Sequence, residues 1–463
     1  MKGEVKKMKS CKRVLLVLLA GVLVLSLFSG CKSGTKTEAT KASTSAAAAT
    51  TAAQTTAASN EKKTFSWATW ALSEESLKPT YMAMAQTFMD ANPNVTIETV
   101  AYPYAQYKDQ LVISAAASNA PDIAHVKAEW VPALLKLGAL QNLNDVLSPE
   151  LKKDYFEAIL KGVTVDGKII SAPWFTNPYA LYYNKTLMEK AGIKELPKNW
   201  TELMAAARKI SALGKDEKGN KIYGYALSNN KSAPGSGYNF FPHMWTFGGE
   251  FCDANGNITI YTPENVKAFE EAKSLYVDEI SPNGSTFKDL RNLFAQGCIG
   301  FYYDLEMAQG PIAEASPKGA DFAKEYSAMV LPSMDGPNGY AYITQHHLAI
   351  FNTCKELPTV AAFADHMSGK VVLQILFDAG MGKMPARSSV TEMEIFKNPA
   401  KEITKAFVAQ LASARSLPGM HESFMLADEA FVDTLALLTI SKDPVDKIVK
   451  DLDAKVKELY GQK

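Results

Sequence analysis

The hydrophobic positions near the start of the folded part change period repeatedly, which predicts strands that alternate with helices. An apolar strand is expected at residues 64–67. Apolar residues then recur at the spacing of one helix face, namely at Tyr81, Met84, Ala85, Phe88 and Met89. Residues 95–99 alternate as a second strand, 104–118 return to helical spacing, and 122–126 form a third strand. This order predicts a parallel sheet covered by helices, in which ligands bind beyond the carboxyl ends of the strands.

A second block of alternating strands and helices is expected from residue 166 to about residue 331. Asp166-Gly167-Lys168 predicts a turn, and strands are expected at 169–172 and 181–183. The aromatic and turn-forming residues 173–179 between those strands predict a loop.

Capping residues mark the helices that follow. Asn184 is the predicted N-cap of a helix at 185–191 that Gly192 closes, and Asn199 with Glu202 resembles a capping box for a helix through Ile210. After Pro385 the chain is expected to be helical, with helices at 398–414, 422–438 and 444–460.

Residues 1–30 are predicted to be a lipoprotein signal peptide. A basic stretch precedes a 15-residue apolar run from Val14 to Phe28, which is shorter than the about 20 residues of a transmembrane helix. Phe28-Ser29-Gly30-Cys31 resembles the bacterial lipobox, so lipidation at Cys31 is expected to anchor the protein to the membrane. Residues 31–63, rich in Ala, Thr and Ser, predict a disordered tether that holds a folded body at the extracellular face of a Gram-positive-type cell membrane.

Composition narrows the class of partner. The chain has 463 residues, which suits about two or three domains. Without residues 1–30, 43 basic residues face 48 acidic ones, so the remainder carries a net charge of −5 with histidine neutral. A mildly acidic chain without clusters of Lys and Arg predicts no nucleic-acid partner. Cys252, Cys298 and Cys354 lie in the folded part, and three cysteines cannot all pair with one another.

Motif searches find no catalytic or cofactor signature. The chain has no phosphate loop, dinucleotide-binding glycine pattern, nucleophile elbow or HExxH sequence. A calcium-loop spacing that starts at Asp253 has Ile258 where that loop requires glycine, so Asn255-Gly256 is better interpreted as a hairpin turn. His346-His347 has no further ligand at metal-site spacing. We therefore expect neither a cofactor nor a metal.

Aromatic residues gather at predicted strand ends, and several lie in loops beside Pro, Gly and Asn. They are Trp70, Trp130, Trp174, Phe175, Tyr179, Tyr238, Trp245 and Tyr303. A flat ring covers the apolar C–H face of a sugar, while amides and carboxylates bond to its hydroxyls. The pattern favours a carbohydrate site.

The segment from Asp166 to Leu203 carries the most specific motif, DGKIISAPWFTNPYALYYNKTLMEKAGIKELPKNWTEL. It resembles the corresponding stretch of the extracellular solute-binding proteins of ABC importers, the family that includes maltose-binding proteins. Further matches extend the resemblance over residues 64–390, at Pro121–Ile123, Leu137–Leu140, Phe247–Gly249, Phe294–Gly297 and Gly380–Arg387.

The resemblance implies an α/β fold of the two-lobe periplasmic-binding-protein type, type II-like. Each lobe would be a mainly parallel sheet flanked by helices, with the ligand cleft between the lobes. Residues 64–174 and 332–383 would form the N-terminal lobe, and 175–331 and 384–463 the C-terminal lobe.

The resemblance also implies which residues contact the ligand. Asn177 stands where maltose-binding proteins have a ligand-binding carboxylate, and Thr344-Gln345 replace a frequent Gly-Gly, which brings His346 into the cleft. Met307 stands where an aromatic platform is common. The full expected set, including Trp245 and Tyr303 from the aromatic pattern, is Trp70, Ser73, Lys127, Glu129, Trp130, Trp174, Phe175, Asn177, Tyr238, Trp245, Tyr303, Asp304, Glu306 and His346.

The expected function is that of a non-enzymatic receptor. The protein would be a monomer that captures a small carbohydrate, such as an oligosaccharide, and delivers it to the transmembrane subunits of an ABC permease. Two alternatives stay open. One is a receptor for a polyamine, whose ammonium groups would pair with Glu129, Asp304 and Glu306. The other is a cell-surface glycosidase that acts through Asp304 or Glu306.

Overall fold

The computed structural model describes residues 61–230, 237–398, 401–416 and 421–462. The predicted signal peptide, the lipidation at Cys31 and the tether up to residue 60 lie outside the described residues. The fold begins at β1 (Lys63–Ala68), close to the strand predicted at residues 64–67.

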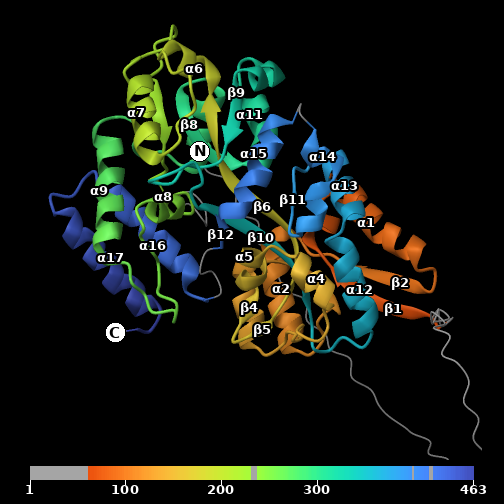
Figure 1. The fold of residues 1–463 in the computed structure, drawn as a ribbon. Coiled ribbons are helices and arrows are strands. Elements are labelled where there is room, and N and C mark those ends of the chain that lie inside the picture. Colours follow the sequence, from red (N-terminus) through yellow and green to blue (C-terminus); the bar gives the residue numbers. More distant parts are fainter. Residues whose placement is uncertain (1–60, 231–236, 399–400, 417–420, 463) are drawn as a thin grey trace, which may run out of the picture. The chain divides into compact units, whose positions relative to one another are not determined.

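The first strand–helix block follows the predicted order. β1 pairs in parallel with β2 (Val95–Val100) and with β3 (Ile123–Lys127). The connections are helices α1 (Lys78–Ala91) and α2 (Tyr104–Ala116). The apolar face of α1 is buried, as its periodicity predicted, and the helix lies beside α13 although the two are far apart in the sequence (Figure 1).

Two long strands connect this block to the rest of the sheet. The strand order is β2-β1-β3-β10-β6-β8-β7. β10 (Ala341–Ile350) is antiparallel to both β3 and β6 (Ala172–Asn184), and the far end of β6 is antiparallel to β8 (Ile299–Leu305). β8 pairs in parallel with β7 (Tyr223–Ala226). The parallel pairs therefore lie toward the two ends of the sheet, and β6 and β10 join them.

The loop predicted at residues 173–179 is wrong, because these residues belong to β6. Proline and asparagine turn signals suggested a break, but both prolines sit where the ladder is irregular. Pro173 lies opposite His347 at a register shift in β10, and Pro178 immediately precedes the residues that pair with β8. A missing N–H group is tolerated at such positions.

The predicted capping residues act as expected. The side chain of Asn184 accepts from the backbone N–H of Leu187, and that of Asn199 accepts from the N–H of Glu202. Asp166 and Gly167 both have positive φ in the tight turn between β4 and β5, as a two-residue hairpin requires.

Short strands and further helices complete the fold. The short strands are β4 (Thr164–Val165), β5 (Lys168–Ile169), β9 (Tyr326–Met329), β11 (Met384–Pro385) and β12 (Ala414–Arg415). The α-helices are α3 (Val131–Lys136), α4 (Pro149–Asp154), α5 (Glu157–Gly162), α6 (Lys185–Lys190), α7 (Trp200–Ser211), α8 (Phe240–Thr246), α9 (Pro263–Val277), α10 (Phe287–Ala295), α11 (Gln309–Ala315), α12 (Leu357–Met367), α13 (Lys370–Asp378), α14 (Glu394–Lys397), α15 (Glu402–Gln410), α16 (Phe424–Leu437) and α17 (Val445–Leu459). The 3₁₀ helices are η1 (Trp70–Ser73), η2 (Ala128–Trp130), η3 (Glu306–Ala308), η4 (Gly319–Lys324), η5 (Ser388–Glu392) and η6 (Leu411–Ser413).

Helices cover the sheet and bury separate hydrophobic clusters. Trp67 and Trp174 pack with Phe363 beside β1, whereas Phe240, Phe269 and other rings fill the space among α8, α9 and α16. Within the described residues, no single helix meets the length and hydropathy needed to cross a membrane, and the bent pair α12 and α13 meets them only together.

Candidate functional site

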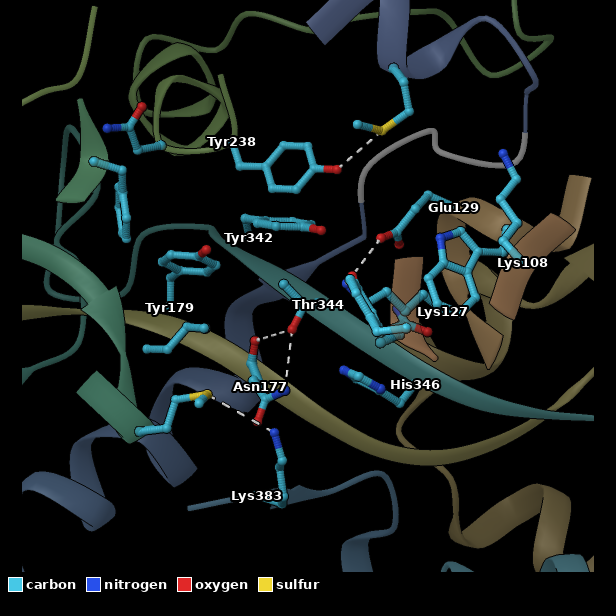
Figure 2. A pocket seen from close by; sticks show the side chains of 18 of the residues that line it. Lys108, Lys127, Glu129, Asn177, Tyr179, Tyr238, Tyr342, Thr344, His346 and Lys383 are labelled. Atoms are coloured by element: carbon cyan, nitrogen blue, oxygen red, sulfur yellow. Dashed lines mark hydrogen bonds and ion pairs between the residues drawn. The ribbon is translucent and has the colours of Figure 1, made fainter. Parts of the chain in front are cut away.

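A pocket of about 830 Å³ lies where β6 and β10 cross from one part of the sheet to the other (Figure 2). Its walls come from segments throughout the chain, including α2, η2, α10, α16 and the segments next to α8 and β11. The lining residues are Tyr104, Lys108, Lys127, Glu129, Trp130, Asn177, Tyr179, Tyr238, Asn239, Phe287, Lys288, Leu305, Met307, Tyr342, Thr344, Gln345, His346, Lys383, Met425 and Glu429.

The floor of the pocket follows from strand alternation. Every second side chain of a strand points to the same face, which places Tyr342, Thr344 and His346 of β10 together. Asn177 of β6 is the direct partner of Thr344, and its amide nitrogen donates to the Thr344 hydroxyl at 3.3 Å. The Asn177 side chain is buried, and its Oδ1 has no hydrogen-bond partner among the described residues.

Tyrosine rings form one wall. Figure 2 shows Tyr238, Tyr342 and Tyr179 one above another. The rings of Tyr179 and Tyr342 are stacked with centroids 5.5 Å apart, and Tyr238 contacts Tyr342 edge-on at 4.8 Å. Behind them, Tyr303 stacks on Tyr179 at 5.0 Å. The wall offers flat apolar surface held in place from behind.

The opposite wall is both aromatic and charged. The Lys127 ammonium donates to the Tyr104 hydroxyl at 2.6 Å and lies over the rings of Tyr104 and Trp130. The same ammonium forms an ion pair of 3.9 Å with Glu129. Burial raises the pKa of the Glu129 carboxyl, and the nearby Lys127 charge opposes that shift.

Lys383 enters the pocket from the position that precedes β11. Its side chain is only 8% exposed and points toward Asn177 (Figure 2). The ammonium lies 4.0 Å from the thioether sulfur of Met307 and over the ring of Phe175. Burial and, to a smaller extent, the Lys127 charge lower the pKa of Lys383 to about 8, although the Glu306 charge acts in the opposite direction.

Gly382 lets the segment that carries Lys383 pass close to η3. It has positive φ, and a Cβ there would collide with the Glu306 carboxylate, so any other residue would push the segment away from η3.

Two hydrogen-bonded histidines, His125 and His346, connect the core to the pocket floor. Nε2 of His125 lies 2.8 Å from Nδ1 of His346, and Nδ1 of His125 lies 3.0 Å from the Thr69 hydroxyl. Burial lowers the pKa of both histidines well below the ordinary value, and the Lys383 and Lys127 charges act in the same direction. His346 therefore contributes a neutral, hydrogen-bonding ring near neutral pH.

Six of the residues expected from the sequence line this pocket: Lys127, Glu129, Trp130, Asn177, Tyr238 and His346. They come from η2 and the strand before it, from β6 and β10, and from the segment that precedes α8. Their side chains reach one cavity because the carboxyl end of β3 lies beside β10.

Six other expected residues do not line the pocket. Trp174 is 1% exposed because it packs against Trp67 and Tyr81 in the core. Trp70 stacks on His125 and supports Trp130 from behind. The other four are placed as follows: Phe175 is buried under His346, Ser73 donates to the Trp70 carbonyl, Trp245 packs beneath Arg415, and Tyr303 accepts from the backbone of Tyr342.

The two carboxylates that the polyamine and glycosidase alternatives required also lie outside the pocket lining. Asp304 is fully buried and bonds to Arg291 through both oxygens, at 2.8 and 3.0 Å. Glu306 accepts from Gln309 and Thr404. Both oxygens of Asp304 and Oε1 of Glu306 therefore bond within the protein, and neither residue lines the pocket.

Several lining residues were missed from the sequence. Tyr179 was expected only as one aromatic among many and Tyr342 not at all, because their roles depend on which face of β6 and β10 meets the cavity. Lys383 had a visible signal, since a lone lysine within the apolar Gly-Met-Gly-Lys-Met-Pro stretch is unusual.

Within the described ranges, no group of three or more His, Cys, Asp or Glu residues could hold a metal ion, and Cys252, Cys298 and Cys354 are free thiols.

The chain matches proteins of known family over most of its length. Residues 73–372 match the model of the bacterial extracellular solute-binding protein family. A protein of Brucella abortus named as a binding protein is 27% identical over 385 residues, which are 81% of this chain and 89% of that one. The diacetylchitobiose binding protein of Streptomyces coelicolor is 25% identical over 60% of this chain and 62% of its own length.

A solved structure supports the fold independently. The cyclic α-maltosyl-1,6-maltose binding protein from Arthrobacter globiformis superposes with a TM-score of 0.73 at 22% identity, covering 86% of this chain and 99% of that one. The predicted fold class, an α/β two-lobe binding-protein fold, is confirmed. The family model covers well over half of the sequence, and the relatives are named as binding proteins rather than enzymes. This chain therefore belongs to the bacterial extracellular solute-binding proteins, the solute receptors of ABC transporters.

Proposed function

We propose that the protein is a carbohydrate receptor that binds an oligosaccharide in the pocket between β6, β10 and η2. The single observation that carries the proposal is the combination of stacked tyrosines on one wall with a polar floor. Tyr238, which is half-buried, can cover the apolar face of a sugar ring, and Tyr342 and Tyr179 support the wall beside it. Asn177, Thr344 and His346 can exchange hydrogen bonds with hydroxyls.

The size of the pocket agrees with such a ligand. A volume of about 830 Å³ lies toward the upper end of the roughly 300–1,000 Å³ of small-molecule sites. The named ligands of two similar proteins, a diacetylated chitobiose and a cyclic maltosyl-maltose, are oligosaccharides, which supports the same class of ligand for this protein.

In the proposed mechanism, residues 64–174 with 332–383 and residues 175–331 with 384–463 move as two lobes. β6 and β10 would act as hinges, because each pairs with strands on both sides of the pocket. A sugar that contacts Trp130 on one side and Tyr238 on the other favours the closed state by its differential affinity. The closed form would then dock on the permease subunits.

A thermal-shift screen of the purified chain against oligosaccharides and polyamines tests the proposal. An oligosaccharide should raise the melting temperature in a concentration-dependent way, since a ligand of the folded state stabilises it by mass action. Chromatography of the recovered sugar should show it unchanged. Stabilisation by polyamines alone, or cleavage of the sugar, would contradict the proposal.

The membrane anchor is a separate part of the proposal. Lipidation at Cys31 would hold the receptor at the extracellular face as a monomer near its permease. Substitution of Cys31→Ser should move the protein from the membrane fraction to the medium without changing sugar affinity. Retention of the variant in the membrane fraction would remove Cys31 as the anchor.

A further inference from the structure

The pocket contains a buried cation, Lys383, that forms no ion pair with the residues that the structure describes. The Lys383 ammonium contacts the Met307 thioether and lies over the Phe175 ring, both weak partners for a full charge. The negative charge that acts on it is that of Glu306, which raises the Lys383 pKa but does not outweigh burial and the Lys127 charge. Burying an unpaired charge is costly, so such a group in a binding pocket calls for an external partner.

The surroundings add positive rather than negative charge. Four lysines and two glutamates line the cavity, although residues 31–463 as a whole carry a net charge of −5. One glutamate, Glu129, is paired with Lys127. Lys108 and Lys288 are exposed at the cavity, and neither forms an ion pair within the described ranges. Lysines therefore outnumber glutamates around the pocket, whereas acidic residues outnumber basic ones in residues 31–463 as a whole.

The Asn177 side chain beside Lys383 favours a ligand that carries hydroxyl groups over a free inorganic anion. Oδ1 of Asn177 is an acceptor with no partner in the part of the chain that the structure describes, and a hydroxyl is a suitable donor for it. Thr344 and His346 stand on the same face of the floor and can exchange further hydrogen bonds. Together the floor presents a cation, an orphan acceptor and neutral polar groups.

Resting on the proposed carbohydrate function, we propose that the preferred ligand is an acidic oligosaccharide, whose anionic substituent binds the Lys383 ammonium while a neighbouring hydroxyl donates to Asn177. The anionic group is the carboxylate of a uronic acid or the sulfate ester of a neutral sugar. Both supply oxygen acceptors to an ammonium, and charged hydrogen bonds of this kind are the stronger ones.

The test uses matched ligands on the purified chain. Oligomers of two to four residues are titrated by calorimetry in three forms that share linkage and length: neutral hexose, uronic acid and sulfated hexose. The wild type should bind one acidic form at least about 10-fold more tightly than its neutral counterpart, as expected for one charged hydrogen bond in a desolvated site. Which acidic form binds distinguishes the carboxylate from the sulfate.

Substitution of Lys383→Met keeps a similar side-chain length and removes the charge. It should reduce the acidic-to-neutral affinity ratio by about 10-fold or more. The ratio is read within one variant, so a general loss of fold cannot mimic the result. Lys221→Met removes a lysine that pairs with Glu279 away from the pocket, and it should leave the ratio unchanged.

The outcomes separate the two proposals. Tight binding of neutral oligosaccharides, with no preference for an acidic form or with a preference that Lys383→Met retains, would overturn the acidic-ligand inference and leave the carbohydrate receptor standing. Failure of every neutral and acidic form to bind would overturn both.

Discussion

Asp304 and Lys383 are both buried charges, yet their surroundings differ completely. Asp304, at the end of β8, accepts from the Arg291 guanidinium, the Tyr302 hydroxyl and the backbone N–H of Leu305. Lys383, beside β11, contacts a thioether and lies over an aromatic ring, and it forms no ion pair with the residues that the structure describes. The charge with a complete set of partners lies outside the pocket, and the charge without one lies inside it.

Structural and functional charges in this fold can be distinguished by whether the protein itself supplies their partners. Burial of Arg291 opposes its charged form, but the hydrogen bonds and negative charge of Asp304 outweigh that effect and raise the Arg291 pKa. At Lys383 burial and the Lys127 charge outweigh the opposing Glu306 charge, and the Lys383 pKa falls to about 8. From the sequence, Asp304 was the expected ligand contact and Lys383 was overlooked, because side-chain type alone does not reveal which charge is already satisfied.

The largest expected effect comes from breaking the satisfied pair. Asp304→Ala leaves Arg291 without its partner and should lower the free energy of unfolding by about 3–5 kcal/mol. Chemical denaturation measures the loss, and Asp304→Asn, which keeps the side-chain shape, should lose less. A variant of unchanged stability but abolished ligand binding would place Asp304 in the site after all.

A substitution in the pocket wall should affect ligand binding more than stability, in contrast to Asp304→Ala. Tyr238→Ala removes a ring that covers the cavity and should weaken carbohydrate binding by about 1–3 kcal/mol. It also removes packing against Tyr342 and Phe424, and the loss of stability should be smaller than in Asp304→Ala. Tyr238→Phe removes only the hydroxyl that donates to the Met425 sulfur, so it should bind nearly as well as the wild type. Equal affinities for all three proteins would exclude stacking on this ring.

Ligand binding should depend on pH if Lys383 binds an anion. The Lys383 ammonium is charged below its pKa of about 8 and neutral above it. The affinity for an acidic oligosaccharide should therefore fall by up to about 10-fold between pH 7 and pH 9, while a neutral oligosaccharide should change little. Titrations in buffers of different ionisation enthalpy should also show proton uptake near pH 8.

The smallest expected effect concerns stability without ligand. Lys383→Met removes a buried charge, so it should stabilise the unliganded protein at pH 7 by about 1 kcal/mol. The folded-state pKa is depressed, which means that the charge destabilises the fold below about pH 8 and ceases to do so as the pH rises past the ordinary lysine pKa. The gain should therefore shrink near pH 11. Destabilisation at pH 7 would indicate that Lys383 has a structural role.

Much of the fold was predictable because it depends on local patterns. The strand–helix order up to Lys127, the caps at Asn184 and Asn199, and the α/β class follow from periodicity and end signals. The continuous course of β6 was not predictable, because its prolines are tolerated only where the ladder changes partners or register, which is a property of the assembled sheet.

The candidate site was predictable in part. Lys127, Glu129 and Trp130 follow a parallel strand, where ligand contacts are expected, and they do line the pocket. Trp174 could not be told from a ligand contact, since a tryptophan between a proline and further aromatics fits a loop as well as a core. Its burial against Trp67 depends on packing between β1 and β6 that no local pattern encodes.

The most direct test of the central claim is a calorimetric titration of the wild type and Tyr238→Ala, side by side, with the oligosaccharide that stabilises the wild type most. A receptor whose tyrosine wall holds a sugar should show saturable one-to-one binding in the wild type and at least about fivefold weaker binding in the variant. Identical binding curves for the two proteins, or no heat of binding to any sugar, would contradict the account.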